Sequence, residues 1–420
     1  MELNEGTGQL MSPTCRHCDS RLEVSFCDLG MSPLANSYLS AEQLDRMEPF
    51  YPLHAYVCAE CFLVQLQEFE TPEQIFTEYA YFSSYSDSWV AHAKAYVDQM
   101  TARFGFDDSS QVIEIASNDG YLLQFFKERG VPVLGIEPAA NVAAAAQEKG
   151  IETLVQFFNP ETAESLGRRG IKADLLLGNN VLAHVPALND FVRAMKIALK
   201  PSGIITMEFP HLLQLMRENQ FDTIYHEHFS YLSLSTVERV FEKFGLRVFD
   251  VDQLPTHGGS LRIYATHVEN DARPVGENII ALKKEEADAG LGGLSAYTAF
   301  SDQVKETKRA LLRFLIEARE EGKSIVGYGA PAKGNTLLNY CGIRTDLVDY
   351  TVDRSPHKQD RFLPGVHLPI HSPDRIRETK PDYVLILPWN IKEEVMKQMS
   401  YIRDWGGRFV VPIPRARVLP

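Results

Sequence analysis

The sequence lacks several features that would each point to a particular class of protein. No stretch of about 18 consecutive apolar residues occurs, which argues against a membrane-spanning helix. The first ten residues, MELNEGTGQL, contain neither the basic segment nor the apolar core of a secretory leader, so we expect a cytoplasmic protein. Positive charge is in deficit, with 42 Lys and Arg against 56 Asp and Glu and no Lys/Arg-rich run, so a nucleic-acid partner is not expected.

What remains is the composition of an ordinary folded protein. Hydrophobic residues make up 45% of the 420 positions and charged residues 23%, which is enough apolar surface for a sizeable core. A chain of this length exceeds one ordinary core and predicts two or three domains. The sequence does not indicate an oligomeric state.

Cysteine is scarce, yet four of the six cysteines form two CxxC pairs: Cys15 with Cys18, and Cys58 with Cys61. Two thiolates from each pair can converge on one tetrahedral Zn²⁺, which predicts a structural zinc site. The 39 residues between the pairs must then loop out from the site. Redox pairs or disulfides are the alternative, which a reducing compartment disfavours. Cys27 and Cys341 have no place in this site and are expected to be buried apolar residues.

From about residue 71 the sequence alternates between strand and helix patterns. Buried strands are expected in QVIEIA (111–116), VPVLGIEP (131–138), ADLLLGNN (173–180) and GIITMEFP (203–210). Strands that alternate with helices predict right-handed crossovers and a mainly parallel sheet. An antiparallel pair, GLRVFDVDQL and GSLRIYATHV, is expected to close this sheet near residue 268. A charged helical region, 276–322, leads into a second α/β segment that starts at SIVGYGAPAKGNTLLNY.

The turn in EIASNDGYLL occupies the position where an α/β sheet binds a nucleotide, at the carboxyl end of the first strand. It lacks the GxGxxG triplet, which disfavours a dinucleotide. Glu137 ends the second strand and suits a carboxylate that accepts both ribose hydroxyls, a pattern that fits S-adenosylmethionine, although NAD enzymes also have such an acid. Asn179 and Asn180 end a third strand at the same edge, where Asn179 could instead cap a loop. The candidate cofactor residues are Glu114, Ala116, Asn118, Gly120, Glu137, Asn179 and Asn180.

Several motifs in order along the chain carry a resemblance to a known family. They are the paired CxxC motifs, EYAYFSSYS (78–86), EIASNDG, GIEP, NNVLAHV (179–185), YHEHFSYLS (225–233), THGGSLR (256–262) and GYGAPAKGNTLLNY (327–340). Together they resemble the zinc-containing sugar C-methyltransferases of deoxysugar biosynthesis. The resemblance spans essentially the whole chain.

This resemblance implies an α/β protein with three domains. These would be a zinc-binding lobe (1–70), a central class I S-adenosylmethionine-dependent methyltransferase domain (71–275) and a Rossmann-like C-terminal domain (276–420). Members of that family methylate a carbon of a nucleotide-linked 4-keto-6-deoxysugar, usually a dTDP-sugar, held between the central and C-terminal domains. We expect methylation at C3, with C5 as the alternative, as a step of natural-product biosynthesis.

Methylation of a sugar carbon requires removal of a proton beside a ketone, followed by stabilisation of the enolate oxygen. His228 is the expected base, because the pKa of an unperturbed histidine suits this step. Glu227 would orient or tune a nearby ring, and Tyr79, His184 and Tyr225 would hold or protonate the enolate oxygen. Tyr79 or His184 could instead be the base.

Other residues of these motifs are expected to hold the substrate or the fold. The glycine turn before the helix in GYGAPAKGNTLL suits a diphosphate, with Lys333 and Asn335 as contacts. His257 and Arg262 are candidate sugar or phosphate contacts. His226 is expected to be a structural histidine that faces away. HEH could also bind a metal, but enolate formation beside S-adenosylmethionine needs none.

Three rival functions remain open at this point. An RNA methyltransferase can also carry a four-cysteine zinc site, but the acidic charge argues against it. A non-catalytic sensor of nucleotide sugars or S-adenosylmethionine would have little need of a base. An NAD-dependent sugar oxidoreductase that uses VGYGAP would bind nicotinamide.

Overall fold

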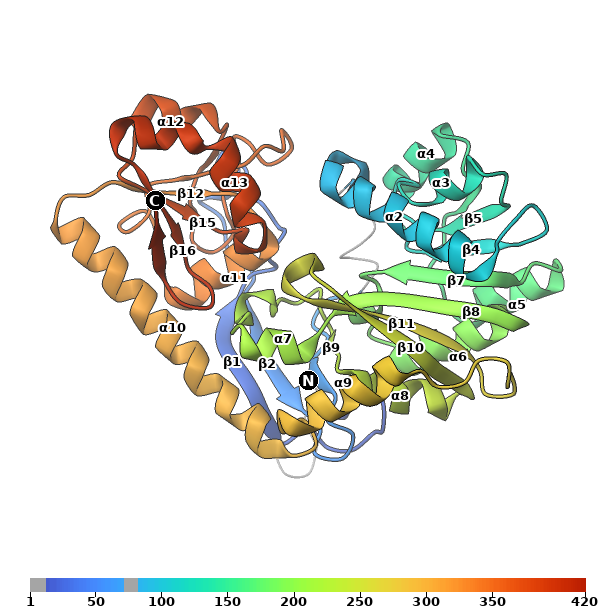
Figure 1. Cartoon of the computed structure of the whole chain (residues 1–420). Helices are drawn as coiled ribbons and strands as arrows, with labels where there is room; N and C mark the ends of the chain where they lie inside the picture. The colour runs from blue at the N-terminus through green and yellow to red at the C-terminus, as the bar shows by residue number, and fades with distance from the viewer. Residues whose placement is uncertain (1–12, 72–81) are drawn as a thin grey trace.

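Three β-sheets organise the part of the chain that the computed structural model describes, residues 13–71 and 82–420 (Figure 1). The first sheet has four antiparallel strands in the order β1-β2-β3-β9: β1 (Val24–Ser32), β2 (Tyr51–Val57), β3 (Val64–Leu66) and β9 (Ser230–Tyr231). Buried and partly buried residues alternate along β2, as expected for a strand with one face in a core. Strand β9, which belongs to YHEHFSYLS, was not expected here and joins the central part of the chain to the zinc-binding lobe.

The second sheet has seven strands in the order β10-β11-β8-β7-β4-β5-β6. Its strands are β4 (Val112–Ile115), β5 (Val133–Ile136), β6 (Thr153–Leu154), β7 (Ala173–Asn179), β8 (Leu199–Pro210), β10 (Leu246–Leu254) and β11 (Ser260–His267). Strands β6, β5, β4, β7 and β8 are parallel, while β11 and β10 are antiparallel, which confirms the predicted sheet and its antiparallel closure. All four residues of β4 are buried, as in a parallel strand covered on both faces.

Seven helices occur among the described residues of this central part. They are α2 (Asp87–Phe104), α3 (Leu123–Lys127), α4 (Ala140–Glu148), α5 (Pro160–Arg168), α6 (Leu188–Ala198), α7 (Leu212–Arg217) and α8 (Leu234–Lys243). Short 3-10 helices accompany them: η2 (Ser83–Tyr85), η3 (Leu182–His184), η4 (Phe221–Thr223) and η5 (Thr256–Gly258).

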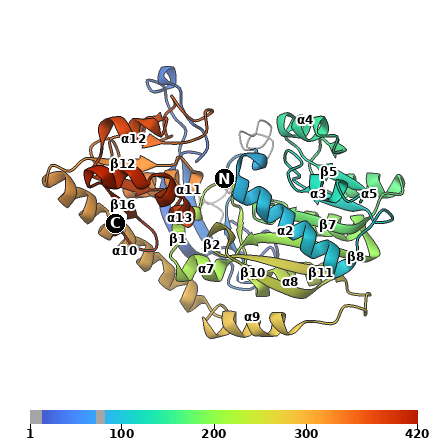
Figure 2. The same ribbon diagram turned by 45° about the horizontal axis from the view of Figure 1, so that its top comes forward.

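Helices α9 (Glu277–Asp288) and α10 (Leu294–Glu320) form the predicted charged helical region and connect the central sheet to the third sheet (Figure 2). Helix α10 has 27 residues and is therefore about 40 Å long. Its buried residues recur every three to four positions, which gives one apolar stripe. Phe300 of this stripe stacks on Phe26 of β1 with ring centroids 4.7 Å apart, so the long helix packs on the zinc-binding lobe.

The third sheet has the order β14-β13-β12-β15-β16-β17 and begins the second α/β segment as predicted. Its strands are β12 (Ile325–Tyr328), β13 (Thr351–Val352), β14 (Ile370–His371), β15 (Tyr383–Ile386), β16 (Arg408–Val411) and β17 (Arg417–Leu419). Its helices are α11 (Ala332–Cys341), α12 (Asp374–Thr379) and α13 (Lys392–Gln398), with the 3-10 helices η6 (Trp389–Ile391) and η7 (Ser400–Trp405).

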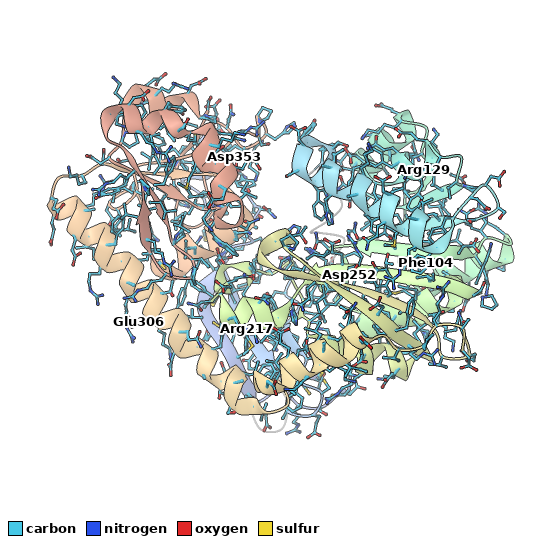
Figure 3. The ribbon with its side chains drawn as sticks, viewed as in Figure 1. Phe104, Arg129, Arg217, Asp252, Glu306 and Asp353 are labelled. Carbon is cyan, nitrogen blue, oxygen red and sulfur yellow. The ribbon has the colours of Figure 1, made fainter. Side chains whose placement is uncertain are left out.

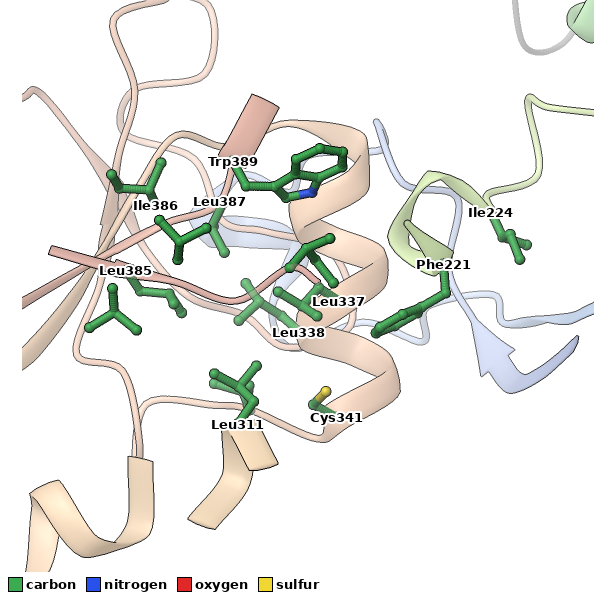
Figure 4. Packing of buried hydrophobic residues seen from close by; sticks show 14 of the residues in the cluster. Phe221, Ile224, Leu311, Leu337, Leu338, Cys341, Leu385, Ile386, Leu387 and Trp389 are labelled. Atoms are coloured by element: carbon green, nitrogen blue, oxygen red, sulfur yellow. The ribbon is translucent and has the colours of Figure 1, made fainter. Parts of the chain in front are cut away.

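One hydrophobic core runs from the zinc-binding lobe through α10 into the C-terminal sheet. In Figure 4, Leu337, Leu338 and Cys341 of α11 lie in this core, between Leu385 of β15 and Phe221 of η4. Cys27 and Cys341 are both buried here, which confirms their predicted environment, and burial raises the pKa of each thiol to about 12. Within the described residues, no helix combines the length and apolar character needed to cross a bilayer.

Candidate active site and metal centre

The four cysteines of the CxxC pairs converge at one point, as the sequence predicts. Their Sγ atoms all lie within 4.8 Å of one another, with Cys15 and Cys61 at 3.6 Å and Cys18 and Cys58 at 3.5 Å. Four thiolates bound tetrahedrally to Zn²⁺ at about 2.3 Å would stand about 3.8 Å apart, so the set fits this ion. Three of the cysteines are buried and Cys18 is partly buried.

Arg16 fastens the metal centre to the central domain from inside the first CxxC. Its backbone N–H donates to the side chain of Gln65 (2.9 Å), and its guanidinium donates to the carbonyl of Pro186 (2.9 Å). The amide of Gln65 in turn donates to Sγ of Cys15 across 3.2 Å. Arg16 and Pro186 are 170 positions apart, so this contact joins the metal centre to the central domain.

The backbone of the predicted cofactor turn, residues 116–120, has φ angles that are unusual for non-glycine residues. Ala116, Asn118 and Gly120 all have positive φ, at 54°, 49° and 74°. Positive φ at non-glycine residues is uncommon and often marks a binding site. A Cβ on Gly120 would lie 3.0 Å from Ile151, so this position also lacks room for a side chain.

Glu137 lies beside this turn, at the end of β5. Its carboxylate accepts from the backbone N–H groups of Asn118 (2.9 Å) and Ala139 (2.9 Å), while burial raises its pKa. Glu114 of β4 is also buried, and burial together with the charges of Glu137 and Asp119 raises its pKa well above the ordinary value.

Several buried polar atoms at this edge of the sheet lack a hydrogen-bond partner among the described residues: Glu114 Oε2, Ser117 Oγ, Asp119 Oδ1, Asn179 Nδ2 and Asn180 Oδ1. Buried polar groups are nearly always paired, so this set suits a polar ligand such as the nucleoside and amino-acid parts of S-adenosylmethionine. Ser117 and Asp119 were missed by the sequence analysis, although they lie between predicted residues of the turn.

YHEHF forms a tight turn, in which the backbone N–H of His228 donates to the carbonyl of Tyr225 (2.8 Å). This turn brings the two side chains together: the hydroxyl of Tyr225 donates to Nε2 of His228 across 2.8 Å. Nδ1 of His228 donates to the carbonyl of Thr223 (2.9 Å). His228 is thus held as a neutral ring with its basic nitrogen toward Tyr225.

His184 of η3, which follows β7, lies beside His228. Its ring lies edge-on to that of His228, with centroids 4.6 Å apart, and hydrogen-bonds to the main chain of Glu227. Burial lowers the pKa of His184 to about 4, and burial together with His184 lowers that of His228 well below the usual value. Both rings are therefore neutral at physiological pH, and the lowered pKa makes each a weaker base than a free imidazole. Tyr79 lies outside the described residues.

His226 and Glu227, the two central residues of the turn, have side chains that point away from the pair of Tyr225 and His228. His226 is buried, and its Nε2 lies 3.2 Å from the carbonyl of Pro52, which confirms a structural histidine facing the zinc-binding lobe. Glu227 accepts a hydrogen bond from Asn36 (2.7 Å) in that lobe. Its predicted tuning of a nearby ring stays a prediction.

A small void of about 10 Å³ lies beside His228, lined also by Thr223, Ser230 and Tyr231. The hydroxyls of Ser230 and Tyr231 are buried; that of Ser230 has no partner among the described residues, and that of Tyr231 faces the main chain of Tyr225. The void has room for about one water molecule, and the two hydroxyls would satisfy it.

Lys333 lies at the start of α11 and faces the central domain. Its Nζ donates to the side chain of Asn390 (2.7 Å) and stands 4.7 Å from the ring centre of Trp389. Trp389 donates from Nε1 to Asp222 (2.7 Å) next to Thr223. Burial lowers the pKa of Lys333, and the charge of Asp222 opposes this shift. Asp222, whose pKa burial raises to about 6, was not singled out from the sequence.

Asn335 and His257, two further predicted substrate contacts, belong to different domains. Asn335 is buried in α11, and its Nδ2 has no partner among the described residues, which leaves a donor for a ligand. His257 lies beside the cofactor edge, with Nε2 3.5 Å from Nδ2 of Asn180 and its ring 5.2 Å from that of Trp89. Burial lowers the pKa of His257 to about 4. Their roles as substrate contacts stay predictions.

Arg262 lies beneath this region and pairs with Glu208 at the end of β8. Its guanidinium donates to Glu208 (3.0 Å) and to Gln99 (3.0 Å), and both charged side chains are almost fully buried. His92 of α2 also contacts Glu208 at 3.0 Å. The geometry thus gives Arg262 an internal partner and does not support its predicted contact with the substrate. His92 and Glu208, far apart in the sequence, carried no local signal.

Asp353 takes in the C-terminal sheet the position that Glu137 takes in the central sheet. It follows β13 and accepts from the backbone N–H groups of Ala330 (2.7 Å) and Ser355 (2.8 Å). Figure 3 labels it on the C-terminal domain. The same arrangement of an acid, a turn and a helix thus occurs twice, and this acid was not among the predicted site residues.

Comparisons with known proteins cover nearly the whole chain. Three family descriptions match in order: "Putative zinc binding domain" over residues 15–76, "Methyltransferase domain" over 89–251 and "C-methyltransferase C-terminal domain" over 255–414. C-methyltransferase NovU of Streptomyces niveus is 35% identical over 407 residues, which cover 96% of each chain. A ubiquinone biosynthesis O-methyltransferase of a Chelativorans species is 28% identical over 120 residues, 26% of this chain and 47% of that protein.

Among solved structures, a SAM-dependent methyltransferase from Anabaena variabilis is 15% identical, with a TM-score of 0.35. The match covers 41% of this chain and 84% of that chain.

Proposed function

The chain belongs to the C-methyltransferase family, as an S-adenosylmethionine-dependent enzyme with an N-terminal zinc-binding domain, and we propose that its substrate is a nucleotide-linked 4-keto-6-deoxysugar. The methyl group goes to a ring carbon, C3 in preference to C5, and dTDP is the preferred nucleotide. The reaction serves natural-product biosynthesis. The domain boundaries stay at about residues 70 and 275.

The observation that carries this proposal is the contact of Tyr225 with His228, beside the ring of His184. A carbon acid next to a ketone needs a neutral base and a donor for the oxygen that becomes negative. Burial keeps both histidines neutral, which leaves the lone pair of each ring unprotonated, and in this proposal His228 accepts the proton from the ring carbon. His184 and Tyr225 hold the enolate oxygen. A binding module has little use for such a pair.

S-adenosylmethionine supplies an electrophilic methyl group when bound. The turn from Ala116 to Gly120 and the carboxylate of Glu137 would hold it at the carboxyl ends of β4 and β5. Asn179 and Asn180 lie at the end of β7, along the same edge. We call the turn formed by YHEHF (225–229) the catalytic turn. Residues of this edge and of the catalytic turn then keep the methyl donor and the sugar carbon aligned, which supplies much of the rate.

The nucleotide handle binds on the C-terminal domain in this proposal. Asp353 and the N-terminus of α11 offer an acid and free N–H groups, and Lys333 and Asn335 lie in the first turn of this helix. Binding energy from the diphosphate and nucleoside then fixes the sugar ring, where the chemistry takes place.

The test is incubation of the protein with S-adenosylmethionine and a dTDP-4-keto-6-deoxysugar in deuterated water, followed by mass and NMR analysis. Deuterium at one ring carbon with the mass gain of one methylene group is expected, and it names the carbon. Binding of both ligands without exchange or methylation would reject this substrate. The same incubation with the corresponding UDP- and GDP-sugars would show whether the enzyme discriminates between nucleotide bases.

A further inference from the structure

The loop between β1 and β2, residues 33–50, leaves the zinc-binding lobe and contacts the C-terminal domain. The backbone groups of Leu39 and Phe362 exchange two hydrogen bonds, at 3.0 and 2.9 Å. The carboxylate of Glu48 accepts from the backbone N–H of Gly365 (2.9 Å) and from His367 (3.0 Å). Two contacts, in the first half and near the end of the loop, therefore hold it in place.

Directly before Leu39, Tyr38 reaches the turn that precedes α11. Its hydroxyl donates to the carbonyl of Ala330 across 2.6 Å, and Lys358 donates to the same oxygen across 2.9 Å. The ammonium of Lys358 also stands 5.2 Å from the ring centre of Tyr38. The loop thus lies against the end of the C-terminal domain that faces the catalytic turn.

Asn36, two residues before Tyr38, contacts the catalytic turn itself. Its Nδ2 donates to Oε1 of Glu227 across 2.7 Å, while its Oδ1 lies 3.3 Å from the hydroxyl of Tyr38. Glu227 is 5% exposed and directly precedes His228. A carboxylate this deeply buried needs donors to remain ionised, and Asn36, 191 positions away in another domain, supplies one.

We propose that the zinc-binding lobe completes the active site, with Asn36 as the positioning residue that holds the carboxylate of Glu227 and so fixes the turn that carries His228. All three domains then contribute to one site: Asn36 and Tyr38 from the lobe, Glu227 from the central domain, and Ala330 with Lys358 from the C-terminal domain. The effect of Asn36 on turnover rests on the function proposed above, whereas its effect on Glu227 does not.

The groups that face Glu227 determine how it responds to pH. Burial raises its pKa to about 7, and the hydrogen bond from Asn36 and the charge of Lys358 oppose this rise. Tyr38 is the other titratable neighbour from the lobe, and the ring of His184 bonds the main chain of Glu227. Removing the donor of Asn36 therefore raises the pKa of Glu227 further.

The first experiment compares the pH dependence of kcat/KM in the wild type, Asn36→Leu and Glu227→Gln. Glu227→Gln identifies the limb of the profile that belongs to this carboxyl, because that limb disappears. In Asn36→Leu the same limb should move to higher pH by about one unit, the effect of losing one hydrogen bond to a charged group. Ser37→Ala is the matched control, since Ser37 is an exposed neighbour in the same loop. A limb that stays in place in Asn36→Leu overturns the proposal.

The second experiment needs no turnover and so separates this proposal from the proposed function. The stability difference between the wild type and Glu227→Gln is measured against pH. Because folding raises the pKa of Glu227 from 4.5 to about 7, ionisation disfavours the folded state, and the difference falls as pH rises through this window. With Asn36→Leu in both proteins, the fall should extend to higher pH. A fall that ends at the wild-type pH shows that Asn36 does not hold the carboxyl.

Discussion

The hydroxyl of Tyr225 donates to Nε2 of His228 across 2.8 Å, and Nδ1 of the same ring donates to the carbonyl of Thr223 across 2.9 Å. The two contacts together assign the tautomer of His228: the proton is on Nδ1 and the lone pair is on Nε2. A proton from the substrate therefore reaches the ring at the nitrogen that Tyr225 contacts. Tyr225 is thus placed to move aside for the substrate or to share its hydroxyl with the substrate oxygen.

Substitution of this pair should separate the base from its partner. His228→Ala is expected to lower deuterium exchange into the sugar by about 100-fold or more, because it removes the group that accepts the proton. Tyr225→Phe should cost less, about tenfold, since Nε2 keeps its lone pair. Exchange is measured by NMR on the nucleotide sugar in deuterated water.

His226→Gln is the control for these two substitutions, because His226 faces Pro52 and lies outside the pair. Its exchange rate should match the wild type. Equal losses in Tyr225→Phe and His228→Ala would instead mean that the proton passes through the tyrosine oxygen. Full exchange in His228→Ala would move the role of base to His184 or Tyr79.

Features set by short spacings could be predicted from the sequence. The two CxxC pairs converge as expected, and the parallel strands with their antiparallel closure follow the hydrophobic runs. YHEHF shows where such reasoning ends. An extended strand, a helix and a turn each place its side chains differently, and the structure has a turn, in which Tyr225 meets His228.

Contacts between distant segments could not be predicted in this way. Arg262 is a candidate sugar or phosphate contact from its place in THGGSLR, but the motif does not reveal its partner inside the protein. Its partner, Glu208, lies 54 positions away on the neighbouring strand, and burial of both charges depends on the packing of α2 above them. Asp222 and Asn36 are similar cases, since each meets its partner only where two domains come together.

Glu208→Gln should destabilise the protein by about 3 kcal/mol at neutral pH, because it leaves Arg262 as an unpaired buried charge. Burial alone would raise the pKa of Glu208, but His92 and Arg262 overcome this and lower it below 4.5. The stabilisation by Glu208 is therefore present above pH 4.5 and is lost as pH falls through the lowered pKa.

Urea unfolding of the wild type and Glu208→Gln at a series of pH values measures this difference. Asp288→Asn serves as the control, since Asp288 pairs with Lys284 on the surface and both side chains are largely exposed. That pair should contribute little at any pH. A Glu208→Gln protein as stable as the wild type at pH 7 would contradict the assignment of a buried ion pair.

Gly258→Ala should disturb the contact between the central and C-terminal domains. A Cβ at this position would lie 2.7 Å from the ring of Trp389, and φ is +91° there, so both the space and the backbone require glycine. We expect a loss of about 1–3 kcal/mol in the free energy of unfolding, together with a higher KM for the nucleotide sugar.

Gly292→Ala is the matched control for this substitution, because a Cβ there meets nothing within 4 Å. Its stability and KM should stay close to those of the wild type. Affinity for S-adenosylmethionine, measured by calorimetry, should be unchanged in both variants, since neither glycine lies at the cofactor turn. A Gly258→Ala protein with wild-type stability would show that the Trp389 contact adjusts without cost.

Removal of the metal should abolish methyl transfer while the cofactor still binds. Cys58→Ala deletes one of four converging thiolates and should yield protein without the one zinc per chain that the wild type carries, at a cost of several kcal/mol. The cofactor turn belongs to the central sheet and keeps its geometry, whereas Asn36 and Tyr38 depend on the lobe that the metal organises.

Cys27→Ala, at a buried cysteine outside the metal centre, should retain the zinc and lose only packing energy. Metal analysis, thermal unfolding and cofactor titration of the three proteins test this; a Cys58→Ala protein that stays active without zinc would refute a link between the metal centre and catalysis.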